Sequence, residues 1–91
     1  MTNKIIAVQG NNLNNLNPLT YTSIFLAKSG ENRGYKIFYY EPKNLSIKNK
    51  KVFANGSFIK IDYSKKKFFK KIKKTHIDLS KVKFILVRQD P

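Results

Sequence analysis

The sequence has no cysteine, which excludes a disulfide framework, a thiolate metal site and a cysteine nucleophile. Long apolar runs are also missing, and none approaches the roughly 20 residues that a membrane span needs. The segment from Met1 to Gln9 has one lysine and no small-residue cleavage pattern, so we expect no signal peptide. Together these absences predict a cytoplasmic protein that does not enter a membrane.

Arginine is scarce although the formal net charge is +14, because only Arg33 and Arg88 stand among the 19 basic residues. Proteins that bind nucleic acids usually rely on arginine for forked contacts to phosphate and guanine. The sequence is also rich in Asn, Ile and Lys, the residues that an AT-rich genome favours. We therefore attribute the charge to composition and keep a small basic nucleic-acid-binding protein as the alternative.

Motifs for cofactors and metals are missing as well. Gly10 follows the first apolar segment without companion glycines, so there is neither a G-x-G-x-x-G fingerprint nor a phosphate-cradling P-loop. The single histidine, His76, has no cysteine and only scattered carboxylates near it in the sequence. This pattern is typical of a surface histidine and gives a metal site little support.

Short apolar segments separated by turn-forming residues are what the chain does contain. Residues 4–9 and 84–87 are apolar without alternation, which is typical of parallel strands covered on both faces. A helix is expected after the Asn-rich loop, and a second strand over residues 35–40, ended by Glu41-Pro42. Strand, helix and strand in this order predict a βαβ unit with parallel strands.

The expected helix has clear signals at both ends. Thr20 or Thr22 is suited to the N-cap, and Gly34 to a left-handed residue at the C-terminal end. Gly30 looks out of place inside this helix, where glycine costs about 1 kcal/mol relative to alanine. From the sequence alone, Gly30→Ala is expected to raise the melting temperature.

Antiparallel strands are expected in the middle of the chain. Residues 45–47 and 52–54 alternate around Asn49-Lys50, which predicts a β-hairpin. Asn55-Gly56 predicts another turn, leading into a strand over residues 58–63. The result would be a small antiparallel meander attached to the parallel sheet.

A lysine-rich segment, residues 64–76, has seven lysines among three apolar residues. The apolar spacing of Phe68, Phe69 and Ile72 fits one face of a helix that Ser64 would cap. Such a helix could bind a phosphate backbone or an acidic membrane surface. We favour a solvated face over a short apolar stripe, because there are only three apolar anchors.

The last expected strand runs straight into Arg88, Gln89 and Asp90. In open α/β sheets, ligands bind beyond the carboxyl ends of the strands. Arg88 is then placed to hold a substrate carboxylate through two parallel hydrogen bonds. The alternative is that Arg88 and Asp90 pair with each other or cap a turn, and the residues themselves leave both interpretations open.

Other polar residues are expected at the same edge of the sheet. If the last strand lies beside the first, on the side away from the second, Gln9 and Asn11 share one crevice with Arg88. Thr22 and Ser23 at the helix start would lie nearby, where free amide groups favour anions. Ordinary helix capping explains Thr22 and Ser23 equally well.

These residues resemble a known family. Arg33-Gly34-Tyr35 closing the helix, the segment 79–87 and above all Arg88-Gln89-Asp90-Pro91 are similar to the N-terminal region of prokaryotic glutathione synthetase. In that family a final strand runs into a motif of the Arg-Lys-Asp-Pro-Pro-Phe type. Tyr39-Tyr40-Glu41, the hairpin from Leu45 to Ala54 and the Thr22-Ser23 pair also fit, so the resemblance covers nearly the whole chain in order and spacing.

The resemblance implies a Rossmann-like α/β fold, the pre-ATP-grasp domain, with a parallel βαβ sheet and an inserted antiparallel meander. Residues 1–91 would form this single N-terminal domain, without the ATP-grasp part. The intact enzyme would join γ-glutamylcysteine to glycine while ATP is hydrolysed to ADP through an acyl-phosphate. ATP and magnesium would be held by the absent part, so this chain alone would bind neither and would be inactive.

For the chain itself, the resemblance implies a role as scaffold, in the contacts of a homo-oligomer and in part of the peptide-substrate wall. Arg88 is the residue expected to contact substrate, followed by Asp90, Thr22 and Ser23, and no catalytic residue is expected. Gln89 replaces the usual lysine, and Tyr21 stands where an acidic residue is expected. Because the motif is incomplete at Pro91, the sequence predicts a truncated domain.

Overall fold

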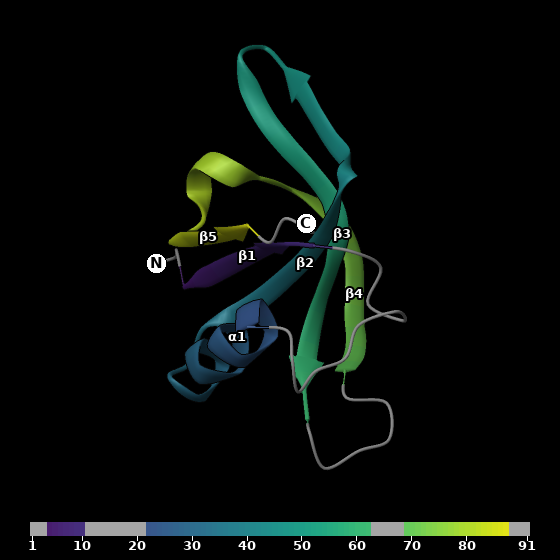
Figure 1. Cartoon of the computed structure of the whole chain (residues 1–91). Helices are drawn as coiled ribbons and strands as arrows, with labels where there is room; N and C mark the ends of the chain where they lie inside the picture. The colour runs from purple at the N-terminus through teal and green to yellow at the C-terminus, as the bar shows by residue number, and fades with distance from the viewer. Residues whose placement is uncertain (1–3, 11–21, 63–68, 88–91) are drawn as a thin grey trace.

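The described residues form one five-stranded mixed sheet with one α-helix (Figure 1). The computed structural model describes residues 4–10, 22–62 and 69–87, and only the backbone of residues 22–25. The strand order is β4-β3-β2-β1-β5. The elements are β1 (Ile5–Gln9), α1 (Thr22–Asn32), β2 (Lys36–Lys48), β3 (Lys51–Ile61), β4 (Phe69–Asp78), the 3₁₀ helix η2 (Leu79–Lys81) and β5 (Phe84–Val87).

The parallel half of the sheet has β1 between β2 and β5. The chain passes from β1 through α1 to β2, which confirms the predicted βαβ unit. Ala27 of α1 is fully buried in a cluster with Ile6, Val8 and Ile37, so the helix covers one face of the sheet. As predicted, β5 lies beside β1 on the side away from β2.

The C-terminal end of α1 forms a Schellman motif around Gly34. Gly34 has a φ of +93°, its amide donates to the Glu31 carbonyl, and the Tyr35 amide donates to the Gly30 carbonyl. These bonds satisfy carbonyl groups that the last helical turn leaves without partners. The predicted helix end at Gly34 is therefore confirmed.

Gly30 has a packing role that its sequence context does not reveal. A methyl group at this position would overlap Cδ1 of Ile6, which is buried in β1. The helix can lie this close to the sheet because residue 30 has no side chain. The sequence-based expectation that Gly30→Ala stabilises the protein is therefore reversed.

We expect Gly30→Ala to lower the melting temperature. Overpacking costs roughly 1–3 kcal/mol and the gain in helix propensity returns about 1 kcal/mol, so the net effect is a loss of about 1 kcal/mol. Thermal unfolding followed by circular dichroism would show a drop of roughly 4–8 °C. Ser29→Ala, at an exposed neighbouring position, is the control. In an Ile6→Val background, which lacks Cδ1, Gly30→Ala should no longer lower the melting temperature. A higher melting temperature for Gly30→Ala alone would contradict this account.

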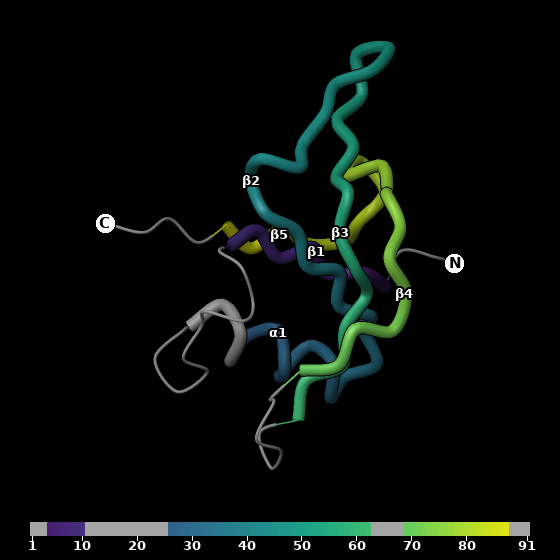
Figure 2. The backbone as a smooth tube through the Cα atoms, turned by 90° about the vertical axis from the view of Figure 1, so that its right-hand side faces the viewer, coloured from purple at the N-terminus to yellow at the C-terminus, as the bar shows by residue number. Residues whose placement is uncertain are grey.

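The antiparallel half contains the predicted hairpin. Asn49 and Lys50 join β2 to β3 with φ values of 53° and 66°, as expected for a two-residue hairpin turn. The predicted strand end at Glu41-Pro42 is wrong, because β2 continues to Lys48 with a shift of register between Tyr40 and Leu45. Pro42 lies in this irregular stretch, where no regular ladder requires its amide. The hairpin extends beyond the rest of the sheet (Figures 1 and 2).

The predicted turn at Asn55-Gly56 is also wrong, because both residues lie inside β3. Gly56 pairs with Tyr40 on one side and Thr75 on the other. A methyl group on Gly56 would overlap the Tyr39 carbonyl oxygen and lie 2.9 Å from Cβ of Tyr40. The glycine therefore permits a close approach of two strands beside the register shift.

The predicted helix over residues 64–76 is wrong for its described part, since residues 69–78 form β4. β4 pairs along β3 from Phe69 to Asp78, and Phe69 is buried in the same cluster as Ala27. Burial and strand pairing outweigh the helix propensity of lysine here. A register shift opposite Phe58 and Ile59 lets Phe69 and Ile77 pack on opposite faces of the sheet. Ser64 lies outside the described residues.

The face opposite α1 is covered by the connection from β4 to β5. Ile77, Leu79 and Val82 pack there against a buried cluster that includes Phe38 and Tyr40. Since β4 and β5 are the outermost strands of the described sheet, this connection passes over its face. Both faces therefore carry a core, one under the helix and one under the connection.

β5 differs from the buried strand that the sequence predicts. Phe84, Ile85 and Val87 are 51%, 43% and 53% exposed, and only Leu86 packs against the core under the helix. The reason is position, because β5 has a neighbouring strand on one side only among the described residues. An apolar run cannot distinguish a strand covered by its own domain from one left open at the edge.

Asp78 fixes the start of η2. Its Oδ1 accepts hydrogen bonds from the Ser80 hydroxyl at 2.7 Å and from the Ser80 amide at 2.9 Å. These bonds, the hydroxyl bond first, stabilise the carboxylate and lower the pKa of Asp78 below its ordinary value.

Ser80→Ala is expected to raise the pKa of Asp78 towards its ordinary value, because the hydroxyl bond is lost. Because the folded-state pKa is lowered, the carboxylate stabilises the fold above the unfolded-state pKa of about 3.9, and this contribution disappears as the pH falls through the folded-state value. An NMR pH titration of the side-chain carboxyl carbons measures both values, with Asp62 as the internal control. An unchanged Asp78 midpoint in the variant would refute the assignment.

Candidate functional site

The carboxyl ends of β1 and β5 meet the end of the parallel part of β2, at Tyr40, at one edge of the sheet, which we call the carboxyl edge. Gln9, the last residue of β1, pairs with Tyr40 on one side and Val87 on the other. The Gly10 amide donates to the Tyr40 carbonyl over 3.1 Å, so β1 leaves the sheet directly after this pairing. Because α1 runs back along β1, its first turn lies at the same end of the sheet (Figure 1).

Two polar side chains of β2 belong to this edge. Tyr40 is 3% exposed and packs against Phe38 at a ring separation of 6.2 Å. Burial raises the pKa of the Tyr40 hydroxyl, so it stays protonated at neutral pH and supports the edge without acting as a base. Glu41 follows, half-buried and 3.8 Å from the Lys43 ammonium, and supplies a carboxylate.

Of the predicted site residues, the structure describes only the backbone of Thr22 and Ser23. Thr22 and Ser23 form the start of α1, but their side chains lie outside the described part. Arg88, Asp90 and Asn11 are also outside the described residues. Val87, the last residue of β5, lies beside Gln9, in keeping with the predicted position of β5 next to β1.

Sequence reasoning did not identify Tyr40 and Glu41 as residues of this edge. The signal in the sequence is their place at the end of an apolar strand. The sequence-based interpretation cited these two residues only as part of the family resemblance. Their role at the edge depends on the pairing of Tyr40 with Gln9, which joins residues 31 positions apart. Local patterns do not contain this pairing.

The described residues do not fit a magnesium site. Among residues 4–10, 22–62 and 69–87, no three His, Asp or Glu side chains gather as ligands for a metal ion would. No helix within these ranges is long and apolar enough to cross a membrane.

Comparison with protein families matches residues 5–91 to the prokaryotic glutathione synthetase N-terminal domain. The chain belongs to this family. The match extends from the first strand through the Arg88-Gln89-Asp90-Pro91 segment, so it includes the whole predicted site. The family resemblance inferred from the sequence is thus confirmed.

Curated relatives agree with the family match. The chain is 33% identical over 86 residues to a glutathione synthetase of Mesorhizobium japonicum and 27% identical over 88 residues to one of Agrobacterium fabrum, covering 94% and 97% of this chain. A glutathione synthetase of Wigglesworthia glossinidia brevipalpis is 33% identical over 70 residues, or 77% of the chain. The chain spans about 28% of the first two relatives and 22% of the third.

The nucleic-acid-binding alternative has no support from these relatives. It depended on the net charge and on a lysine-rich helix over residues 64–76, and the described part of that segment is strand β4. The glutathione synthetase family is therefore the basis for the functional proposal.

Proposed function

We propose that this chain is the N-terminal domain of a glutathione synthetase, the ATP-dependent ligase that joins γ-glutamylcysteine to glycine. The observation that carries the proposal is the family match over residues 5–91. The fold is compatible with a Rossmann-like pre-ATP-grasp domain, since a βαβ unit is extended by an antiparallel meander. Residues 1–91 would form this one domain, and the protein would act in the cytoplasm.

The domain would contribute one wall of the site for the peptide substrate. Support comes from the pairing of Gln9 with Val87, after which the chain continues into Arg88. The Arg88 guanidinium would hold a substrate carboxylate in a bidentate geometry. Asp90, Thr22 and Ser23 would add polar contacts at the carboxyl edge.

ATP and magnesium would be bound by the ATP-grasp part of the intact enzyme, which supplies the phosphoryl transfer. No catalytic group is assigned to the residues of this chain, whose role would be to position the peptide substrate and support the fold. The chain alone would accordingly be inactive.

Exposed apolar surfaces support a scaffold role. The β5 side chains Phe84 and Val87 would contact further parts of the enzyme. Ile47, 78% exposed near the tip of the projecting hairpin, would contribute to contacts between subunits of a homo-oligomer. Its pairing partner Val52 is also exposed, and contiguous exposed apolar groups mark contacts between proteins.

A domain graft tests the proposal. The 86 aligned residues of the Mesorhizobium japonicum enzyme would be replaced by those of this chain. We expect the graft to release ADP only when both γ-glutamylcysteine and glycine are present. A folded graft that lacks this dependence, as judged by circular dichroism and ADP release, would refute the proposal.

A further inference from the structure

Side chains of α1 form hydrogen bonds with the backbone at the end of β3. The Ile61 amide donates to Oε1 of Glu31 over 3.3 Å, and Nζ of Lys28 donates to the Ile61 carbonyl over 2.7 Å. Lys28 also pairs with Glu31 at 3.3 Å. The charges of Lys28 and Glu31 therefore largely compensate each other.

Four lysines lie next to these hydrogen bonds. We call them the lysine cluster, which consists of Lys36, Lys60, Lys70 and Lys73. Lys60 pairs directly with Lys70 across β3 and β4, so their side chains share one face. Lys36 joins them from β2, because the pairing of Ile37 with Ile59 brings it beside Lys60.

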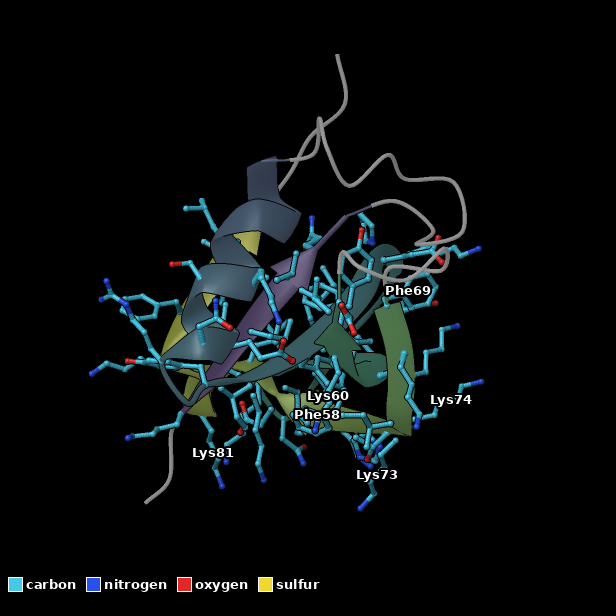
Figure 3. All side chains as sticks on the ribbon, turned by 90° about the horizontal axis from the view of Figure 1, so that it is seen from below. Phe58, Lys60, Phe69, Lys73, Lys74 and Lys81 are labelled. Atoms are coloured by element: carbon cyan, nitrogen blue, oxygen red, sulfur yellow. The ribbon has the colours of Figure 1, made fainter. Side chains whose placement is uncertain are left out.

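Lys73 pairs with Phe58 on the same face, and Figure 3 shows Phe58, Lys60 and Lys73 gathered on one side of the sheet. All four lysines of the cluster are exposed, and none of the ion pairs within the described ranges includes them. Positive charge therefore outweighs negative charge here, since the carboxylates beside the cluster among the described residues are those of Glu31, which pairs with Lys28, and Asp62.

A pocket of about 390 Å³ adjoins the lysine cluster. Tyr35, Phe58 and Ile72 supply its apolar wall. Lys36, Lys60 and Lys73 supply its positive charges, and the Glu31 carboxylate also lines it. A second pocket of about 730 Å³ shares Glu31, Tyr35 and Lys60 with the first and adds Lys28, Lys70 and the carboxylate of Asp62. Volumes of this size are typical of small-molecule sites.

This region is separate from the proposed substrate wall. Lys36 is the first residue of β2, whereas Tyr40 at the carboxyl edge lies beyond Phe38 along the same strand. The lysine cluster therefore belongs to the other end of the parallel strands. The family match assigns no ligand to it.

We propose that the lysine cluster and its pocket bind a small phosphate-bearing anion of the polyphosphate or organic phosphate class. Like charges directly across a strand pair repel, and a multivalent anion between them removes this repulsion. Lysine binds phosphate as a point charge. A pocket of about 390 Å³ has the size of a small-molecule site, whereas single-stranded nucleic acid is bound along an extended groove. An AT-rich composition explains how many lysines there are but not their placement around one pocket.

The test uses the full chain and isothermal titration calorimetry with tripolyphosphate, inorganic phosphate and citrate in separate titrations. We expect one tripolyphosphate per chain, with weaker binding of inorganic phosphate and of citrate. Lys60→Gln/Lys73→Gln should weaken tripolyphosphate binding about tenfold or more, because two of the charged contacts are lost. The control Lys48→Gln/Lys83→Gln changes the net charge equally but at exposed positions outside the cluster, and should retain the affinity within about twofold.

NMR amide shifts provide a second readout, in which tripolyphosphate should perturb Phe58, Lys60 and Ile72. Equal weakening in both double variants would reduce the effect to general charge and overturn the proposal. Equal affinity for citrate and tripolyphosphate would overturn the assignment of a phosphate ligand. Tighter binding of a DNA duplex, lost equally in both double variants, would overturn the assignment of the pocket as the binding site. Absence of any binding at low salt would overturn the proposal as well.

Discussion

Gly56→Ala is expected to destabilise the protein by about 3 kcal/mol, at the upper end of the usual cost of overpacking. A methyl group at this position would overlap the Tyr39 carbonyl oxygen. That oxygen belongs to the backbone of β2 and cannot rotate away as a side-chain atom would. For a domain of this size, the loss corresponds to a drop in melting temperature of roughly 12–24 °C.

The matched control for this variant is Asn55→Ala, an exposed position in the same strand. If Asn55-Gly56 formed a turn, both substitutions would be harmful, because turns favour Asn and Gly together. Within β3, only the glycine matters, and Asn55→Ala should stay within about 0.5 kcal/mol of the parent. Thermal melts of the two variants decide, and a Gly56→Ala protein with the parent's melting temperature would contradict the close strand approach.

Arg88→Ala in the domain graft is expected to lower kcat/KM for γ-glutamylcysteine by roughly 10–100-fold. Hydrogen bonds to a charged group are worth about 1.5–3 kcal/mol, which corresponds to this range. The loss should concern the peptide substrate and leave the KM for ATP unchanged, because ATP would be held by the other part of the enzyme. Steady-state ADP release at varied concentrations of each substrate measures these constants.

Arg33→Ala is the control for the loss of an arginine, since Arg33 is exposed beyond the end of α1. Arg88→Lys keeps the charge but not the forked geometry, and should recover only part of the activity. An Arg88→Ala graft with parental constants for γ-glutamylcysteine would remove Arg88 from the proposed substrate wall.

The sequence predicted those elements whose signals are local. Gly34 at the end of α1 and Asn49-Lys50 in the hairpin each act within a few residues of their own position. At Asn55-Gly56 the local signal was misleading, because the reason for the glycine is Tyr39 on the neighbouring strand. The segment 64–76 was assigned to a helix for a similar reason, since only pairing with β3 shows that residues 69–78 are extended.

The same distinction applies to the candidate sites. The order of β5 and β1 follows from general rules of βαβ topology, so the position of Val87 beside Gln9 could be predicted. The lysine cluster could not, because Lys36, Lys60 and Lys70 come from three strands whose register is set by long-range pairing. A count of lysines records their number but gives no information about their neighbours.

The central claim, that this chain is the N-terminal domain of a glutathione synthetase, is tested most directly by recombining two separate polypeptides. The unaltered chain would be mixed with the remainder of the Mesorhizobium japonicum enzyme, that is, the enzyme without the segment that aligns with this chain. We predict ADP release that requires γ-glutamylcysteine, glycine and both polypeptides, with none from either polypeptide alone. If the chain is folded and binds the remainder, yet the mixture releases no more ADP than the remainder alone, the claim is contradicted.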